Sequence, residues 1–265
     1  MFDWLQYDFM QIALLAVVLV VPLMALLGTL VVNNRMSFFS DALGHSALTG
    51  VAVGVIAGVS DYRWILVLFG VAFALLMNRI RHSRLSSTDT VIGVFSSVGV
   101  ALGLALLSAR GNLANYQSLL VGDILSITAD ELWILGLALI ATVVVWVLCF
   151  NGFFAVSISP ALSRSKGCPV WLYDNLFVVL VAVIVMLAIR WVGLLLINAM
   201  LILPAAAARN VARSMRSFHL LSVVFGLFSG VLGLALSYYN GIATGPAIIL
   251  VLAAVFFGTF LLRKK

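Results

Sequence analysis

The sequence predicts an all-α, polytopic membrane protein. Of its 265 residues, 64% are hydrophobic and only 9% are charged, and the mean hydropathy is +1.23. Apolar runs of about 20 residues, the length that spans a bilayer as a helix, recur along the whole chain. These runs lack the strand-like alternation that is typical of outer-membrane barrels. We therefore expect a single transmembrane domain over residues 1–265, with eight to nine transmembrane helices.

Nine apolar runs are the expected spans, and short polar turns separate them. The spans cover residues 11–32, 40–59, 64–77, 89–107, 132–150, 172–189, 191–208, 220–237 and 246–262. Pro22 can kink the first span, because proline lacks a backbone donor and clashes with the preceding turn. Residues 151–169 form the longest non-apolar stretch. A count of eight spans, with one short or re-entrant segment, stays open.

Four basic clusters set the expected orientation in the membrane. They lie at residues 79–84, 164–166, 209–216 and 263–265. Basic residues stay on the cytoplasmic side, so an odd number of crossings, about nine, places all four clusters there. The acidic N-terminus and the loops that hold Asp61 and Asp123 then lie outside. The net charge of +6 is explained by these clusters, so we expect contact with membrane lipid and none with nucleic acid.

Asp41 and His45 stand four residues apart at the start of a largely apolar run. On a helix they lie about 40° apart on one face, one turn above the other. Ionisable groups at membrane depth are costly, so they usually face a cavity or a partner. A carboxylate and an imidazole are also common ligands of divalent metals. Two ligands are too few for a storage site, and they favour a site through which a metal passes.

The same run also allows a structural interpretation. Asp41 can be a first-turn acid that stabilises the start of a helix, and His45 can be a buried imidazole bonded to a carbonyl group. Gly50, Gly54 and Gly58 form a small-xxx-small stripe roughly opposite to the pair, which predicts close helix packing.

The sequence contains no motif for catalysis. It has no Walker A glycine loop, no His-Glu-x-x-His and no Gly-x-Ser-x-Gly, so neither an ATPase site nor an intramembrane enzyme is supported. Cys149 and Cys168 form no paired motif, so we expect neither a disulfide nor a structural zinc site. We expect a conduit that draws its energy from another subunit and holds no permanent cofactor.

Residues 40–50 read Ser-Asp-Ala-Leu-Gly-His-Ser-Ala-Leu-Thr-Gly. This stretch resembles the Asp-Ala-Leu-Ser-His-Ala-x-Leu-x-Gly signature of the permease subunits of bacterial zinc and manganese ABC importers. Gly44 stands where that family has serine, and the spacing of acid and histidine is kept. Further matches follow in order along the chain, at residues 89–93, 120–123, 192–196, 203–209 and 245–246.

Residues 159–167 resemble the family's Asp-Pro-Glu-x-Ala-x-x-x-Gly segment. The resemblance implies a cytoplasmic helix that docks on the ATPase, with Pro160, Arg164 and Gly167 in the matching stretch. Ser159 and Ala161 replace the family's two acids, which leaves docking plausible and changes its electrostatics. A solvated basic loop is the alternative.

Three further polar residues are candidates for the pathway or a gate. Asp89 begins a span, and Asp123 ends the Leu-Val-Gly-Asp match in an expected outer loop. Each can instead be a helix cap. Asn198 lies inside a span, where a hydrogen bond between helices is an equally good explanation.

The resemblance implies the transmembrane subunit of an ABC importer for zinc or manganese in the bacterial cytoplasmic membrane. Its fold is expected to resemble that of cobalamin and siderophore permeases, and its implied partners are a second copy of the permease, two cytoplasmic ATPase subunits and an extracytoplasmic metal-binding protein. The metal is the transported substrate. A permease for metal chelates is one alternative. An ion-driven secondary transporter is another, although no inverted repeat is visible. Carboxylate and imidazole suit zinc, manganese and iron alike.

Overall fold

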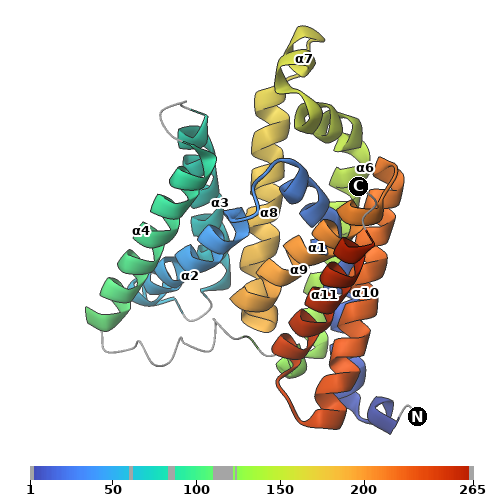
Figure 1. Cartoon of the computed structure of the whole chain (residues 1–265). Helices are drawn as coiled ribbons and strands as arrows, with labels where there is room; N and C mark the ends of the chain where they lie inside the picture. Colours follow the sequence, from blue (N-terminus) through green and yellow to red (C-terminus); the bar gives the residue numbers. More distant parts are fainter. Residues whose placement is uncertain (1–2, 60–61, 83–86, 110–121, 123, 263–265) are drawn as a thin grey trace.

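The computed structural model describes residues 3–59, 62–82, 87–109, 122 and 124–262 (Figure 1). Every regular element in these ranges is a helix, which confirms the all-α prediction. The elements are η1 (Asp3–Gln6), α1 (Asp8–Asn33), α2 (Phe39–Ile56), α3 (Arg63–Arg81), α4 (Thr88–Ala109), η3 (Ile124–Ser126), α6 (Ala129–Ile158), α7 (Pro160–Ser165), α8 (Val170–Val192), α9 (Leu194–Val211), α10 (Met215–Asn240) and α11 (Thr244–Leu261).

Within the described ranges, nine helices are long and apolar enough to cross a membrane. They are α1 to α4, α6 and α8 to α11, so the count agrees with the larger of the two expected numbers. Figure 1 shows successive spans running in alternating directions. The C-terminal ends of α3, α6 and α9 therefore lie at one end of the bundle, which we call the cytoplasmic end because it carries three of the four basic clusters. The fourth cluster, Asp61 and Asp123 lie outside the described residues.

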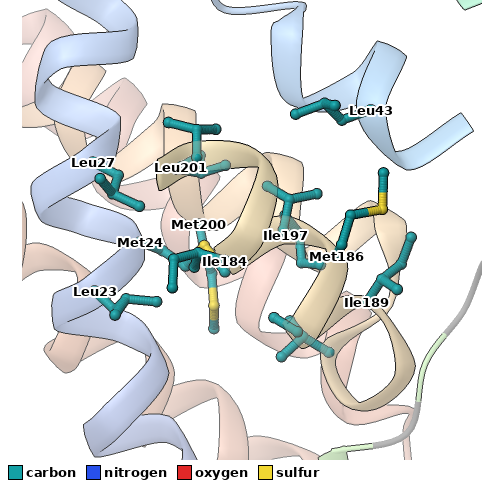
Figure 2. Packing of buried hydrophobic residues seen from close by; sticks show 14 of the residues in the cluster. Leu23, Met24, Leu27, Leu43, Ile184, Met186, Ile189, Ile197, Met200 and Leu201 are labelled. Atoms are coloured by element: carbon teal, nitrogen blue, oxygen red, sulfur yellow. The ribbon is translucent and has the colours of Figure 1, made fainter. Parts of the chain in front are cut away.

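The core lies where α1, α8 and α9 meet the start of α2. Figure 2 shows Leu23, Met24 and Leu27 of α1 beside side chains of α8 and α9, with Leu43 of α2 at the far side. These helices are largely apolar, so small residues decide which faces approach most closely. Gly28 is one such residue, because a Cβ atom there would lie 1.9 Å from the carbonyl oxygen of Leu201. The contact between α1 and α9 therefore depends on this glycine.

Helix α2 packs on both α3 and α4 through glycines. On the α4 side, Gly99 lies against Ser46, and the Thr49 hydroxyl donates to the Gly99 carbonyl oxygen at 2.6 Å. On the α3 side, Gly50 faces Leu66 and Phe69, and Gly54 lies against Tyr62. The predicted stripe is thus confirmed for Gly50 and Gly54.

Gly58 departs from that prediction, because it lies in the turn after α2. Its φ of 68° is a left-handed conformation that favours glycine, and a Cβ atom there would meet nothing within 4 Å. The glycine serves to end the helix and makes no interhelical contact.

Two helix boundaries differ from the prediction for reasons that the packing and the backbone show. Helix α6 continues to Ile158 and does not stop near residue 150, because Phe153 is buried against Trp146 and Phe177 and extends the packed face. The junction between α8 and α9 falls at Gly193, three residues later than expected. Gly193 has φ 78° and ψ 156°, a conformation essentially restricted to glycine, and this single residue connects the two helices.

Candidate metal site

Asp41 and His45 lie on one face of α2, as their spacing predicted. Asp41 belongs to the first turn of the helix, and His45 follows one turn later. The His45 Nε2 atom lies 3.5 Å from the Asp41 Oδ2 atom, and the two side chains are 34% and 38% exposed, respectively. His45 is therefore partly open and sits beside the carboxylate, so the alternative of a fully buried imidazole does not describe this structure.

Asn198 of α9 completes the surroundings of Asp41. Its Nδ2 group donates to the Asp41 Oδ1 atom at 2.8 Å, across 157 residues of sequence. The two carboxylate oxygens of Asp41 thus face different neighbours, an amide on one side and an imidazole on the other. The Asn198 Oδ1 atom is buried and has no hydrogen-bond partner among the described residues. Of the two alternatives for Asn198, the interhelical hydrogen bond is present, and its acceptor is a candidate metal ligand.

Two glycines bring α9 close enough for this contact. The one-residue connection at Gly193 starts α9 immediately after α8, so Leu194 is the first residue of the new helix. Leu194 packs directly on Gly44 of α2, where a Cβ atom would lie 1.7 Å from the Leu194 Cδ1 atom. Asn198 is one turn further along α9 and meets Asp41. A larger side chain at position 44 would therefore need the Leu194 side chain or the helix to move.

The pair is not a closed metal-binding cage. Within the described parts of the chain, no three His, Cys, Asp or Glu side chains converge on one point. A carboxylate oxygen, an imidazole nitrogen and an amide group are what this site offers a cation. So few ligands, partly exposed, suit transient contact with a divalent ion better than permanent storage.

Asp89, another candidate for the pathway, does not join this group. Asp89 is exposed in the first turn of α4. Gly99, the residue of α4 that packs beside Ser46, comes ten residues after Asp89. Ten residues correspond to about 15 Å along the helix, so Asp89 lies nearer the cytoplasmic end than this contact. Its position fits an acid that favours a helix N-terminus. Asp123 lies outside the described residues.

Residues 159–167 contain the short helix α7 (Pro160–Ser165), which projects at the cytoplasmic end between α6 and α8 (Figure 1). The Ser159 hydroxyl caps it by accepting from the Leu162 amide at 3.3 Å, and Pro160 occupies its first position. Its other end closes on Gly167, where φ is 76°, and the Cys168 amide donates back to Ser163. The local sequence therefore encodes a capped helical turn rather than the solvated loop that was the alternative. Arg164 lies on its exposed surface.

A polar cluster that the sequence analysis missed joins α3 to α8 at the cytoplasmic end. Arg81 Nη2 lies 3.1 Å from both carboxylate oxygens of Asp174, and Asn78 Nδ2 donates to Asp174 Oδ2 at 2.7 Å. Asn78 Nδ2 also donates to Asn175 Oδ1 at 2.9 Å. The side chains of Arg81 and Asp174 are only 11% and 13% exposed. The sequence contains only a weak signal for this cluster. Asn78 and the Asp174-Asn175 pair stand near the ends of two apolar runs, and this does not show that the two runs pack together.

Nine helices in the described part of the chain are long and apolar enough to span a bilayer, which defines a multi-pass membrane protein. The chain belongs to the ABC 3 transport family, whose sequence profile matches residues 6–263. It is 32% identical over 261 residues to the manganese import system permease protein ScaB of Streptococcus parasanguinis, covering 98% of this chain and 92% of that protein. It is 30% identical over 257 residues to the high-affinity zinc uptake system membrane protein ZnuB of Haemophilus influenzae, covering 96% and 97%.

Solved structures show the same fold. PsaBC from Streptococcus pneumoniae, in complex with Fab, matches with a TM-score of 0.85 and 32% sequence identity, over 98% of this chain and 94% of that chain. A metal-chelate type ABC transporter in an inward-facing conformation matches with a TM-score of 0.74 over 96% and 86%, at 16% identity. The second likeness concerns the fold alone, and it bears out the expected similarity to the permeases of chelate importers.

Proposed function

We propose that this chain is the transmembrane subunit of an ABC importer for manganese or zinc, and that the ion passes over Asp41 and His45. The observation that carries the proposal is the geometry of this pair, held by Asn198 and open on one side. Relatives named for manganese import and for zinc uptake support the same substrate class. The ion is cargo, so the site has to bind it and also release it.

Each side chain has a distinct part in this proposal. The ionised carboxylate of Asp41 offsets the charge of a divalent cation, and the neutral imidazole of His45 supplies a nitrogen ligand. The hydrogen bond from Asn198 fixes the carboxylate, so that its second oxygen stays directed toward His45. Protonation of His45 removes its ligand atom, so acid competes with the metal. A second copy of the chain, related by a two-fold axis, would double the ligands to four.

Energy would come from partner subunits. No nucleotide-binding motif occurs in the sequence, so the driving step belongs to a separate cytoplasmic ATPase. Helix α7 is the proposed docking element, because it projects from the cytoplasmic end and connects two spans directly. A metal-binding protein would deliver the ion from outside.

Uptake measurements in vesicles test the proposal directly. Asp41→Asn removes the charge and keeps the shape, and His45→Leu removes the donor nitrogen. Both variants are expected to lose ATP-dependent uptake of manganese and of zinc, when uptake is normalised to assembled permease–ATPase complex. Asp130→Asn is the matched control, because Asp130 is an exposed acid in the first turn of α6, away from the pair. Normal uptake by both Asp41→Asn and His45→Leu would remove this site from the mechanism.

A further inference from the structure

A cavity of about 650 Å³ opens at the cytoplasmic end, between α3, α7 and α8. Its walls include Leu75 and Arg79 of α3, Arg164 of α7, and Trp171 and Asp174 of α8. We call this cavity the α7 pocket. One wall belongs to the proposed docking helix and the others belong to two membrane spans, so an occupant would touch all three elements at once.

The α7 pocket carries positive charge that the described residues leave without an acidic partner. Asp174 is the one acidic residue among those that line the pocket. Its carboxylate already accepts hydrogen bonds from Arg81 and Asn78, and His82 Nε2 lies 3.5 Å from its Oδ2 atom. Arg79 and Arg164 are exposed, and no side chain in the described ranges pairs with either. Two guanidinium groups therefore line the cavity without an anionic partner in the described part of the chain.

Helix α7 adds to this charge. Its six residues contain Arg164 and no acid, and Lys166 caps its C-terminal end in an exposed position. Serine and alanine stand at positions 159 and 161, where the resembling segment of the family carries Asp and Glu. The docking surface of this chain is consequently basic.

We propose that the α7 pocket receives acidic side chains of the ATPase subunit, and this rests on the proposed function. Guanidinium groups bind carboxylates in paired hydrogen bonds, and a partly enclosed pocket strengthens such contacts relative to open solvent. An acid seated between Arg79 and Arg164 would link the docking helix to α3 and α8, so movement of the ATPase would reach the spans. A basic pocket between spans also suits an anionic phospholipid headgroup. The projecting wall formed by α7 favours the ATPase.

The test is co-purification of the ATPase subunit encoded beside this permease with the full-length permease in detergent. The double variant Arg79→Glu and Arg164→Glu is expected to lower the amount of co-purified ATPase about tenfold or more. The new glutamates would face the acidic side chains of the ATPase, and like charges repel across the contact. Arg79→Lys with Arg164→Lys keeps the charge and is expected to retain most of it. Arg213→Glu is the control, since Arg213 is an exposed arginine at the same end that does not line the cavity. Added salt should release the ATPase from the unaltered chain.

Other outcomes separate this proposal from the function on which it rests. If the unaltered chain retains no ATPase, both are contradicted. If deletion of residues 159–167 releases the ATPase while the double glutamate variant retains it, docking through α7 holds and the acidic occupant is ruled out. If that variant keeps the ATPase but loses bound anionic phospholipid in native mass spectrometry, the pocket is a lipid site and this proposal is overturned.

Discussion

Two acid-containing clusters in this protein use similar residues in opposite ways. On α2, Asp41 is about one-third exposed, and its imidazole neighbour lies at 3.5 Å. At the cytoplasmic end, Asp174 is almost fully buried, and donors at 2.7 to 3.1 Å surround it. The second cluster is closed by its own chain, whereas the first leaves room for a ligand. Asp41, which its own chain leaves partly open, is therefore a better candidate for binding a ligand than Asp174, although both are aspartates.

The largest expected effect is a loss of stability at the closed cluster. Asp174→Ala leaves the buried Arg81 guanidinium without its carboxylate, which should cost about 3–5 kcal/mol of folding free energy. Asp41→Asn should cost less than about 1 kcal/mol, because Asp41 is partly exposed and, among the described residues, accepts a hydrogen bond from Asn198 alone. Thermal unfolding of the detergent-solubilised variants measures both. Equal destabilisation would remove the contrast between the clusters.

Gly44→Ala tests whether the open pair depends on the close approach of α9. The added Cβ atom would lie 1.7 Å from the Leu194 Cδ1 atom, so the leucine or the helix has to move, at a cost of about 1–3 kcal/mol. Leu194→Ala in the same chain should recover much of that loss by vacating the space. Thermal unfolding of the single and double variants gives the interaction term. If the two effects simply add, the contact does not control the site.

Asn198→Ala removes the amide that holds Asp41 and should weaken apparent metal affinity about tenfold, as loss of a supporting hydrogen bond does at other metal sites. Concentration-dependent uptake, normalised to assembled complex, measures this. Asn210→Ala is the control, because Asn210 is on the same helix and bonds Thr259 rather than a candidate ligand. Unchanged affinity in Asn198→Ala would make its hydrogen bond purely structural.

The helices and the Asp41–His45 pair could be predicted from sequence because both depend on local spacing. Apolar runs report spans whatever their neighbours are, and residues four apart share a helix face in any context. The contact of Asn198 with Asp41 could not be predicted, since it joins positions 157 residues apart through the turn at Gly193. The hydrogen bond between Asn78 and Asp174 could not be predicted either, because nothing in the two apolar segments indicates that they pack against each other.

The local sequence pattern also predicted the wrong ends for α6 and α8. The stretch after residue 150 contains Asn151 and Gly152, which read as a break. Burial of Phe153 against α8 overrides that signal. Trp191 and Val192 read as the start of the next span because they are apolar, although Gly193 ends the helix one residue later. Composition alone did not determine where these two helices end. Tertiary packing sets the end of α6, and the backbone conformation of Gly193 sets the end of α8.

The smallest expected effect is that of a substitution at Thr49, which tests whether the site formed by Asp41 and His45 extends further along α2. Thr49 follows His45 by one more turn, but it is buried, and its hydroxyl donates to the Gly99 carbonyl oxygen at 2.6 Å. Thr49→Val keeps the shape and removes this interhelical bond, so it should cost about 0.6 kcal/mol of stability, a typical value inside membranes. Because Thr49 is satisfied by α4, uptake per assembled complex should match that of the unaltered chain. Thermal unfolding and vesicle uptake of the same preparation measure both quantities. A loss of uptake without a loss of stability would extend the ion's path one turn beyond His45.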